Sequence, residues 1–443
     1  MGFIYGLAVV LIIFEGIIIQ CEGGCAFSSN QGQNAIPTDD INDELEHLPD
    51  DVIGQIVKKL NFERIYQYMR FPKKPITRVI MSRIFQDYII EIDERGRPDD
   101  PDIEKYRVQG DSFITIKNYR KFEVFFNEYA DQVKKIQISY SSLSCEVPHK
   151  EINQNFIKQC AGHLEELRFG YQGDIGFWEE ISEGKNYFTF PEVTTFQTKG
   201  CTQKKFDLNL IFPKLKSLKL SGTVADGNCL ANLKELEEFT LCTNSIKEHK
   251  LDKLFANNLN LRMIHLYSPN RTETMRSIAK YSTKLETLSI ESPGEAIANG
   301  DFSFDMPNLK KLILTAFQPI DRILNFINYF KKLEKVKFGS SDNFAIERIG
   351  YLQHLREIET TISEFNAESL KRMFRSFDKK CKLQTLKFKY FPRSNSMGAY
   401  EAEMEKIDIY LQNSMERTWT LSRGKQIETY DRTFMFTRKP SKK

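Results

Sequence analysis

The sequence has no large excess of charge of either sign. Its 443 residues include 63 lysine and arginine residues and 60 aspartate and glutamate residues, so the formal net charge is only +3. Proteins that bind polyanions without sequence preference usually carry a clear excess of lysine and arginine. The balance therefore argues against a general polyanion binder, and we expect no nucleic-acid partner.

Cysteine is sparse and scattered. Two of the eight cysteines stand near the N-terminus, at positions 21 and 25, and the others are Cys145, Cys160, Cys201, Cys229, Cys242 and Cys381. There is no C-x-x-C pair, and no cysteine stands at zinc-ligand spacing from a histidine. We expect no metal and no other cofactor, and we interpret the six downstream cysteines as buried free thiols. If the chain matures in the endoplasmic reticulum, Cys229 and Cys242 form the most plausible disulfide, because they fall in adjacent repeat units.

Signatures of common catalytic sites are also absent. The sequence contains no G-x-S-x-G, no P-loop, no G-x-G-x-x-G and no H-E-x-x-H. The histidines are scattered and more typical of surface or hydrogen-bonded side chains than of ligands: His47, His149, His163, His249, His265 and His354. We therefore expect a protein that is not an enzyme and has no catalytic residue.

The long apolar run of the sequence is at its N-terminus. Residues 3–14 are apolar, Glu15 and Gly16 interrupt the run, and residues 17–19 resume it. Spanning a bilayer takes roughly 20 apolar residues, whereas a signal peptide needs roughly 7–15 followed by small residues. We predict a signal peptide over residues 1–26, hence secretion without a stable membrane anchor. An uncleaved anchor is the alternative, and both Glu15 and the lack of a basic residue before the run are atypical of a signal. The polar residues 27–40 are typical of a flexible linker.

A leucine-rich pattern, L-x-x-L-x-L, recurs along most of the chain. Its first positions are Val133, Leu164, Val193, Leu215, Leu236, Leu261, Leu285, Leu309, Leu333, Leu355 and Leu383. Successive copies are 21 to 31 residues apart, with four intervals of 24 or 25 residues in the middle. Leucine-rich repeats have periods of about 20–29 residues. We therefore predict a leucine-rich-repeat solenoid of about eleven repeats over residues 91–390, followed by a C-terminal cap and basic tail over 391–443.

Between the predicted strands the apolar spacing becomes helical. Ile323, Ile327 and Phe330 fall at i, i+4 and i+7, and Met275 and Ile278 share one face. Each unit is thus a strand followed by a helix, and stacked units form a curved parallel sheet lined outside by helices. A general α/β enzyme is the alternative, and it is disfavoured because no glycine-rich phosphate loop follows any strand. The N-glycosylation sequon at Asn270 lies in a predicted loop.

Residues 41–90 lack the repeat and favour a small all-α module. The run Leu-Pro-Asp-Asp-Val-Ile-Gly-Gln-Ile-Val-Lys-Lys-Leu covers residues 48–60, and its two aspartates suit the first turn of a helix. Further helices are predicted around residues 65–69 and 76–85. The run resembles the opening of an F-box, and an F-box followed by leucine-rich repeats is the arrangement of substrate receptors in cullin-type ubiquitin ligases.

That resemblance implies an F-box-like module that docks on the Skp adaptor of a cullin ligase scaffold. The adaptor-binding residues would be Leu48, Pro49, Val52, Ile53, Ile56, Val57 and Leu60. The usual ending, a basic residue and then Trp, is absent, which puts the affinity for the adaptor in question. A helical cap for the solenoid is the alternative. With its signal peptide, the chain resembles secreted insect effectors of gall-midge saliva and parasitoid-wasp venom, which act in host cells.

The concave face of such a solenoid is lined by the residues that alternate with the leucines on each strand. We expect a protein target to bind there, through Met263, His265, Tyr267, Lys311, Lys335, Lys337, Lys387 and Lys389. The first three form an adaptable anchor of the kind found at binding hot spots. The lysines either favour an acidic partner or form a solvated face.

Two functions fit these features. One is a ubiquitin-ligase substrate receptor, secreted and then delivered to the cytosol of a host cell, where an adaptor is present. The other is an extracellular leucine-rich-repeat binding protein or decoy, whose helical module is only a cap.

Overall fold

The computed structural model divides the chain into two units, residues 1–52 and 53–443. It describes residues 49, 52, 75–93, 103–108, 111–117, 123–139, 156–170, 188–199, 207–222, 227–242, 246–267, 272–291, 306–318, 320–330, 332–340, 352, 354–362, 367–377, 382–390, 402–407, 409–410, 419–423 and 432–439. The predicted signal peptide, the linker and Asn270 lie outside these residues, as do Leu48, Ile53, Ile56, Val57 and Leu60 of the predicted adaptor-binding set.

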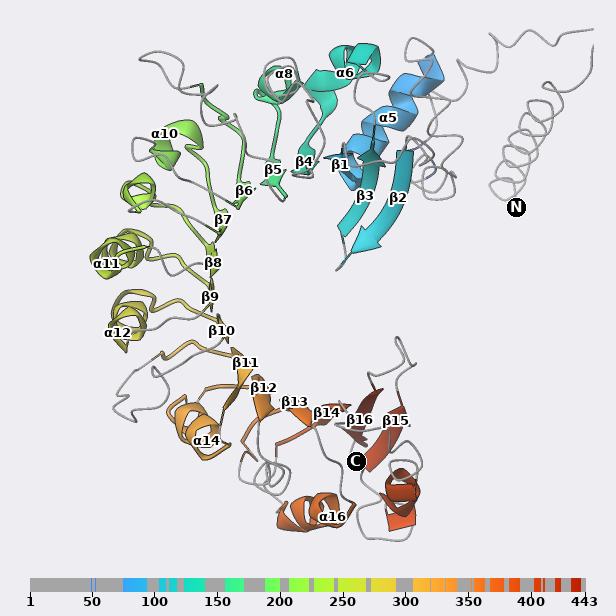
Figure 1. Ribbon diagram of the computed structural model, residues 1–443, viewed down its shortest axis with the longest axis vertical. Coiled ribbons are helices and arrows are strands. Elements are labelled where there is room, and N and C mark those ends of the chain that lie inside the picture. Colours follow the sequence, from blue (N-terminus) through green and yellow to red (C-terminus); the bar gives the residue numbers. More distant parts are fainter. Residues whose placement is uncertain are drawn as a thin grey trace, which may run out of the picture. The chain divides into compact units, whose positions relative to one another are not determined.

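A single sheet organises the second unit, with sixteen strands in the described part of the chain (Figure 1). The strands are β1 (Ile89–Asp93), β2 (Ile103–Val108), β3 (Asp111–Ile116), β4 (Lys135–Ser139), β5 (Glu166–Phe169), β6 (Thr195–Thr198), β7 (Ser217–Ser221), β8 (Glu238–Cys242), β9 (Met263–Tyr267), β10 (Thr287–Glu291), β11 (Lys311–Gln318), β12 (Lys335–Ser340), β13 (Glu357–Ile362), β14 (Thr385–Tyr390), β15 (Trp419–Arg423) and β16 (Arg432–Arg438). From β4 to β14 each strand pairs in parallel with the next strand along the chain.

Each copy of the leucine pattern forms one of the strands from β4 to β14, and each strand begins two residues after the first apolar residue of its copy. In the repeat that starts at Leu261, for example, β9 begins at Met263, and Ile264 and Leu266 point into the core, 0% and 2% exposed. The predicted strands and their order are confirmed. The fold is a leucine-rich-repeat solenoid.

Helices and single helical turns form an outer layer that covers one side of the sheet. The other side of the sheet is its inner face (Figure 1). The layer comprises α6 (Glu123–Tyr129), η3 (Ala130–Gln132), α8 (Lys158–Cys160), α10 (Leu208–Ile211), η5 (Asn228–Leu230), α11 (Glu248–Asn257), α12 (Thr272–Tyr281), α14 (Ile320–Asn328) and α16 (Ala367–Ser376). The helical face predicted from Met275 and Ile278 is buried, with both side chains 1% exposed or less.

The outer helices differ in length from one repeat to the next. The intervals of 24 and 25 residues that begin at Leu236, Leu261 and Leu309 hold α11, α12 and α14, which are nine or ten residues long. The intervals of 22 and 21 residues that begin at Val193 and Leu215 leave room only for α10 and η5, of four and three residues. The expectation of a strand and a full helix therefore holds in these three repeats and not in the two shorter ones. The 31-residue interval that begins at Val133 shows only α8, of three residues, within the described part of the chain.

In each repeat, one residue lies between the first apolar residue and the first residue of the strand. These residues line the end of the sheet at which the strands begin, and we call them the edge row. They are Lys134, Glu165, Thr194, Lys216, Glu237, Arg262, Glu286, Lys310, Glu334, Arg356 and Gln384. At every junction between consecutive repeats, the edge-row carbonyl accepts two backbone N–H groups of the next repeat. The carbonyl of Arg262, for instance, accepts from the N–H groups of Glu286 and Thr287, both at 2.9 Å. This continuous ladder satisfies the backbone where the chain enters each strand.

The N-terminal end of the sheet departs from the repeat. Strand β1 lies between β4 and β3, parallel to both, and β2 forms an antiparallel hairpin with β3. The helix expected over residues 76–85 is present as α5 (Pro75–Asp87), and its Phe85 contacts Tyr129 of α6, with ring centroids 6.2 Å apart. The sequence pattern indicated no strand before Val133, because β1 is buried along its whole length and shows no alternation.

The C-terminal end is closed by an aromatic cluster. β16 pairs antiparallel with β14, and β15 with β16. Phe374 of α16 lies 5.2 Å from Phe436 and 5.6 Å from Trp419 between ring centroids. Both partners are at most 5% exposed, so β15 and β16 cover the apolar end of the last repeat.

The disulfide considered between Cys229 and Cys242 is not formed. Cys229 is buried in η5 on the helical side of the sheet, whereas Cys242 alternates with the buried Leu241 and lies on the inner side. The sheet therefore separates the two sulfur atoms. Cys160 is a buried free thiol, and burial raises its pKa well above the ordinary value.

Within the described ranges, no helix has the length and apolar character needed to cross a membrane. The same residues contain no group of histidine, cysteine or carboxylate side chains that could hold a metal ion.

Candidate binding face of the sheet

The inner face of the sheet consists of the side chains that alternate with the buried apolar residues of each strand. All eight residues predicted to bind a target lie on this face, on β9, β11, β12 and β14. They fall into two groups. The β9 cluster is Met263, His265 and Tyr267, and the lysine zone comprises Lys311, Lys335, Lys337, Lys387 and Lys389 with the two glutamates of β13, Glu357 and Glu359.

The β9 cluster presents apolar and aromatic surface. Met263 and His265 are half-buried, and Tyr267 is 45% exposed. In the sheet register His265 lies beside Ser289 of β10, and Tyr267 beside Glu291. Because Tyr267 is a large aromatic group at the end of a rigid strand, it offers contact area at a small cost in conformational entropy.

Glu291 orients the imidazole of His265. The Nε2 atom of His265 lies 3.3 Å from Oε1 of Glu291. Burial lowers the pKa of His265 from 6.5 and the positive charge of Lys219 adds to this, while Glu291 acts in the opposite direction without reversing the shift. The imidazole is therefore neutral at neutral pH, so its Nε2–H donates to Glu291 and its Nδ1 is left as a hydrogen-bond acceptor.

The lysine zone is tied together by ion pairs between three neighbouring strands. The Nζ of Lys335 lies 2.7 Å from a carboxylate oxygen of Glu357. Three other lysines converge on Glu359 from both neighbouring strands, with Nζ–O distances of 3.2 Å for Lys337, 3.4 Å for Lys387 and 3.5 Å for Lys389. One carboxylate thus faces three ammonium groups, and none of the three is fully neutralised by it.

Glu359 is the most buried charged group of the zone. Its side chain is 17% exposed, whereas those of Lys337 and Lys389 are 42% and 39% exposed. Burial alone would raise the pKa of Glu359, but the hydrogen bond from Lys337 and the charges of Lys387 and Lys389 outweigh it and lower that pKa. Glu359 is therefore ionised at neutral pH and acts as the anionic centre of the zone.

Strand β11 connects the two groups and carries two features of its own. Lys311 is exposed, and within the described part of the chain it forms no ion pair. The register between β11 and β12 shifts between Leu314 and Phe317, a bulge that brings Phe317 opposite Gly339. Bulges re-aim neighbouring side chains and are common beside functional sites. Gly339 has no side chain to cover the adjacent Lys337.

At the N-terminal end of the inner face, polar side chains form hydrogen bonds with one another. The buried carboxylate of Glu91 accepts hydrogen bonds from Thr115 Oγ1 (2.7 Å), Gln137 Nε2 (2.7 Å) and Ser139 Oγ (2.9 Å). These four side chains are satisfied internally, so they hold β1, β3 and β4 together and present little to a partner.

Positive and negative charges are nearly balanced in the edge row. Apart from Thr194 and Gln384 its residues alternate in sign, and they form ion pairs between repeats. Nζ–O distances are 3.0 Å for Lys216 with Glu237 and 3.0 Å for Lys310 with Glu286, and Arg356 lies 3.7 Å from Glu334. The lysine zone, with five lysines and two glutamates, therefore has an excess of positive charge that the edge row does not have.

Three features of the face were missed by the sequence interpretation. Glu291 was not recognised as the partner of His265, Ile313 was not placed on the inner face between the two groups, and the edge-row alternation was overlooked. The same alternation of positions that identified Met263 and Lys337 also marks Ile313 and Glu291. The sign alternation of the edge row is visible once the repeats are aligned.

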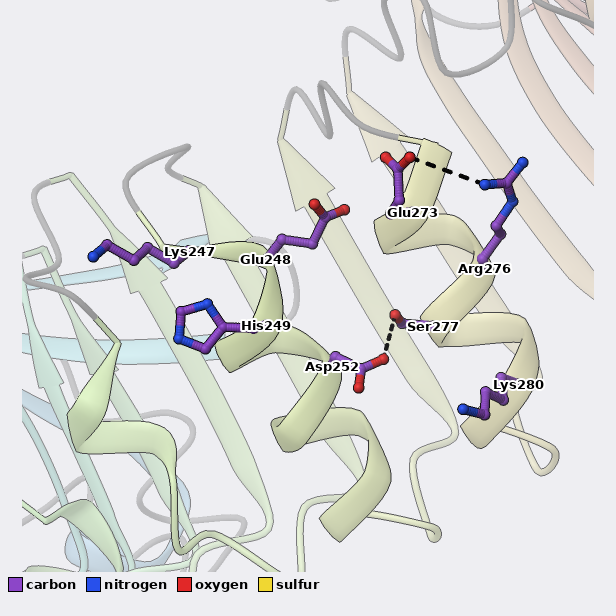
Figure 2. A pocket seen from close by; sticks show the side chains of 8 residues that line it. All are labelled: Lys247, Glu248, His249, Asp252, Glu273, Arg276, Ser277 and Lys280. Atoms are coloured by element: carbon purple, nitrogen blue, oxygen red, sulfur yellow. Dashed lines mark hydrogen bonds and ion pairs between the residues drawn. The ribbon is translucent and has the colours of Figure 1, made fainter.

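The outer layer carries a groove between α11 and α12 of about 690 Å³ (Figure 2). It is lined by Lys247, Glu248, His249, Asp252, Glu273, Arg276, Ser277 and Lys280. Ser277 donates a hydrogen bond to Asp252 at 2.7 Å and joins the two helices. Arg276 pairs with Glu273 of its own helix at 3.9 Å, and the other charged groups are spread along the two helices (Figure 2). With three acidic and three basic side chains and no shared focus, the groove is a packing feature between two helices.

Two residues of the predicted adaptor-binding set are described. Pro49 is exposed, Val52 is helical and half-buried, and the N–H of Val52 donates to the carbonyl of Pro49 at 2.9 Å. The helical state of Val52 and its bond to Pro49 agree with the helix expected in this part of the sequence.

No model of a known protein family matches the sequence. No curated protein matches it either. Similar solved structures include an internalin from Listeria monocytogenes, 14% identical with a TM-score of 0.29, over 57% of this chain and 75% of the internalin. They also include a leucine-rich-repeat protein from Leptospira interrogans, 13% identical with a TM-score of 0.29, over 64% of this chain and 72% of that one. At this level of similarity, function has to be inferred from the side chains of this protein itself.

Proposed function

We propose that this protein is a non-enzymatic binding scaffold that holds a protein partner on the inner face of its sheet. The observation that carries the proposal is the continuity of the inner face from β9 to β14. An aromatic anchor, Tyr267, and a zone of surplus lysines lie on one rigid parallel sheet. Large apolar and aromatic side chains beside charged groups are typical of protein-binding hot spots.

Selection of peptides on the immobilised full chain tests this proposal. Peptides from a random phage library are selected on the wild type and then measured against Tyr267→Ala/His265→Ala. We expect the selected peptides to lose at least about tenfold in affinity, the size expected when a hot-spot aromatic side chain is removed. The matched control is Tyr329→Ala, which removes a similarly exposed tyrosine from the outer layer, 44% exposed. Equal binding to both variants contradicts an inner-face site.

We further propose that residues 48–60 dock on the Skp adaptor of a cullin ubiquitin ligase, so that the bound partner becomes a ligase substrate. Two things support this: the F-box-like run in the sequence, and the helical state of Val52 with its bond to the Pro49 carbonyl. The adaptor-binding residues would be the set from Leu48 to Leu60 named above.

A pull-down with purified Skp adaptor tests the docking. We expect the full chain to retain the adaptor and Leu48→Ala/Pro49→Ala to lose it, while Tyr267→Ala retains it because Tyr267 lies on the inner face. Failure of the folded wild type to bind the adaptor overturns the ligase role. The protein would then be an extracellular repeat protein or decoy, and the inner-face proposal would be unaffected.

Secretion followed by action in a host cell is the proposal that accommodates both a signal peptide and an F-box. It rests on the apolar run at residues 3–19 and the small residues that follow it. Expression of the full chain in insect cells, with N-terminal sequencing of the protein in the medium, tests the first step. We expect a mature chain that begins near residue 27, and retention of the intact chain inside the cells would contradict secretion.

A further inference from the structure

The two groups of the inner face differ in chemistry and lie at a defined separation along the sheet. Three strand spacings separate β9 from β12, and five separate β9 from β14. Neighbouring strands lie about 4.8 Å apart, so the β9 cluster is roughly 14 Å from the lysines of β12 and roughly 24 Å from those of β14. An extended peptide covers these distances with about four to seven residues, at about 3.3–3.6 Å for each residue.

Between the two groups the inner face carries one carboxylate, Glu291 of β10, which is paired with His265 at 3.3 Å. β10 contributes Thr287 and the buried Ser289, and β11 contributes Ile313 and Thr315, which are uncharged. Lys311 stands beside Lys335 in the register of β11 and β12. A chain that crosses the strands from the β9 cluster toward Lys387, by way of Ser289 and Ile313, therefore passes uncharged side chains and then an increasingly positive surface.

We propose that the partner is a protein with an acidic segment, which lies across the strands and places an apolar or aromatic residue on the β9 cluster and carboxylates on the lysine zone. The proposal rests on the inner face being the binding face and specifies the chemistry of what it holds. The apolar anchor and the acidic residues of the segment are separated by about four to seven residues, as the strand spacing requires.

The arrangement around Glu359 indicates how the acidic segment is received. Glu359 is the carboxylate that three lysines of β12 and β14 share, and those lysines keep a third or more of their side-chain surface exposed. An incoming carboxylate adds a second anion to a site that already holds one among three cations. Glu359 thus keeps the lysines in place in the free protein and competes with the partner for them.

Two adjacent residues provide a matched pair of charge reversals. Lys311 lies on the inner face, and Lys310 belongs to the edge row and pairs with Glu286 at 3.0 Å. Both are exposed, and Lys→Glu changes the net charge by the same amount at either position. Only Lys311→Glu alters the charge of the proposed acidic-segment site, so it separates a local effect from the general attraction between opposite charges.

Peptides selected from the random phage library on the full chain are sequenced and then measured by fluorescence anisotropy at low salt. We expect enrichment in Asp and Glu at about four to seven residues from an apolar or aromatic residue. We expect Lys311→Glu to weaken binding about tenfold and Lys310→Glu by less than about twofold, the difference shrinking at about 1 M salt because free charges are screened. Glu359→Gln, which removes the competing carboxylate and preserves the side-chain shape, is expected to strengthen binding.

The outcomes separate this inference from the function on which it rests. Peptides that lose affinity for Tyr267→Ala/His265→Ala but show no acidic enrichment, or respond equally to Lys310→Glu and Lys311→Glu, overturn the acidic partner and leave the inner face as a binding face. Peptides that respond to none of the inner-face substitutions overturn both proposals. Tighter binding by Glu359→Gln is not expected of a residue that only stabilises the fold.

Discussion

Arg168 on β5 reaches Asp111 at the start of β3, with its Nη1 atom 2.8 Å from Oδ2, although β4 and β1 lie between the two strands in the sheet. Arg168 also pairs with Glu166 of its own strand. The guanidinium therefore ties the N-terminal hairpin to the first repeats. Arg168 lies on the inner face, but its donors are already engaged within the protein.

Arg168→Met is expected to weaken the N-terminal end of the solenoid. The Arg168 side chain is 19% exposed and Asp111 is 46% exposed, so the loss lies between those of surface and buried pairs, about 1–2 kcal/mol in the free energy of unfolding. Urea denaturation followed by circular dichroism measures it. Lys214→Met, which breaks the exposed pair with Glu192, is the control and is expected to cost less than about 0.5 kcal/mol. Equal effects would contradict a tethering role for Arg168.

Asn258 and Ser282 occupy the same position in consecutive repeats, three residues before the first leucine. Their replacement by alanine is expected to change the free energy of unfolding by different amounts. The buried amide of Asn258 donates to the carbonyls of Leu233 (2.9 Å) and Leu254 (2.8 Å) and accepts from the N–H of Leu236 (2.9 Å). Asn258→Ala removes these partners from the Leu233 carbonyl and the Leu236 N–H, while the Leu254 carbonyl keeps the backbone N–H of residue 258 at 3.1 Å. The substitution is expected to cost about 2–3 kcal/mol in unfolding free energy.

The hydroxyl of Ser282 is buried but finds no hydrogen-bond partner among the described residues. Ser282→Ala is therefore expected to change the free energy of unfolding by less than about 0.5 kcal/mol, in either direction. Chemical denaturation of both variants under one set of conditions makes the comparison. A large loss for Ser282→Ala would show that its hydroxyl has a partner after all.

His265 makes the stability of the fold depend on pH in a predictable direction. Burial lowers its pKa in the folded protein below 6.5, so at pH values below 6.5 the unfolded chain takes up the proton more readily. The stability of the folded state is therefore complete above that value and falls as the pH drops from 6.5 through the folded-state pKa. Between about pH 7.5 and about pH 5.5 we expect the wild type to lose more unfolding free energy than His265→Gln, which lacks this group. Parallel losses in the two proteins would contradict the shift.

Glu286 tests whether the alternating charges of the edge row stabilise the stack. It lies 3.0 Å from Lys310 and 3.8 Å from Arg262, measured between the charged atoms. Glu286→Lys places three cations in succession and is expected to lower the free energy of unfolding by about 1 kcal/mol at low salt, with a smaller effect at high salt. Glu286→Gln, which removes the attraction without adding repulsion, should cost less. A loss that is independent of salt would point to packing instead of charge.

The sequence predicts much of the solenoid because each repeat carries its own information. A first apolar residue such as Leu261 or Leu285 marks a strand that begins two residues later, and alternation within the strand identifies inner-face side chains such as His265 and Lys337. Local spacing is enough here, because every repeat buries its leucines against its neighbours in the same way. The N-terminal strand β1 escaped this reasoning, since it is buried throughout and shows no alternation.

What the sequence determined by itself is therefore the repeat: where each strand of the solenoid begins, which face each residue takes, and which types of side chain the inner face displays. The tertiary structure alone decided which of those side chains meet. Glu359 gathers lysines from strands on both sides, Glu291 holds His265, and Arg168 reaches past two strands to Asp111. These partners come from different strands, mostly more than twenty residues apart in the chain, and strand order and register bring them together.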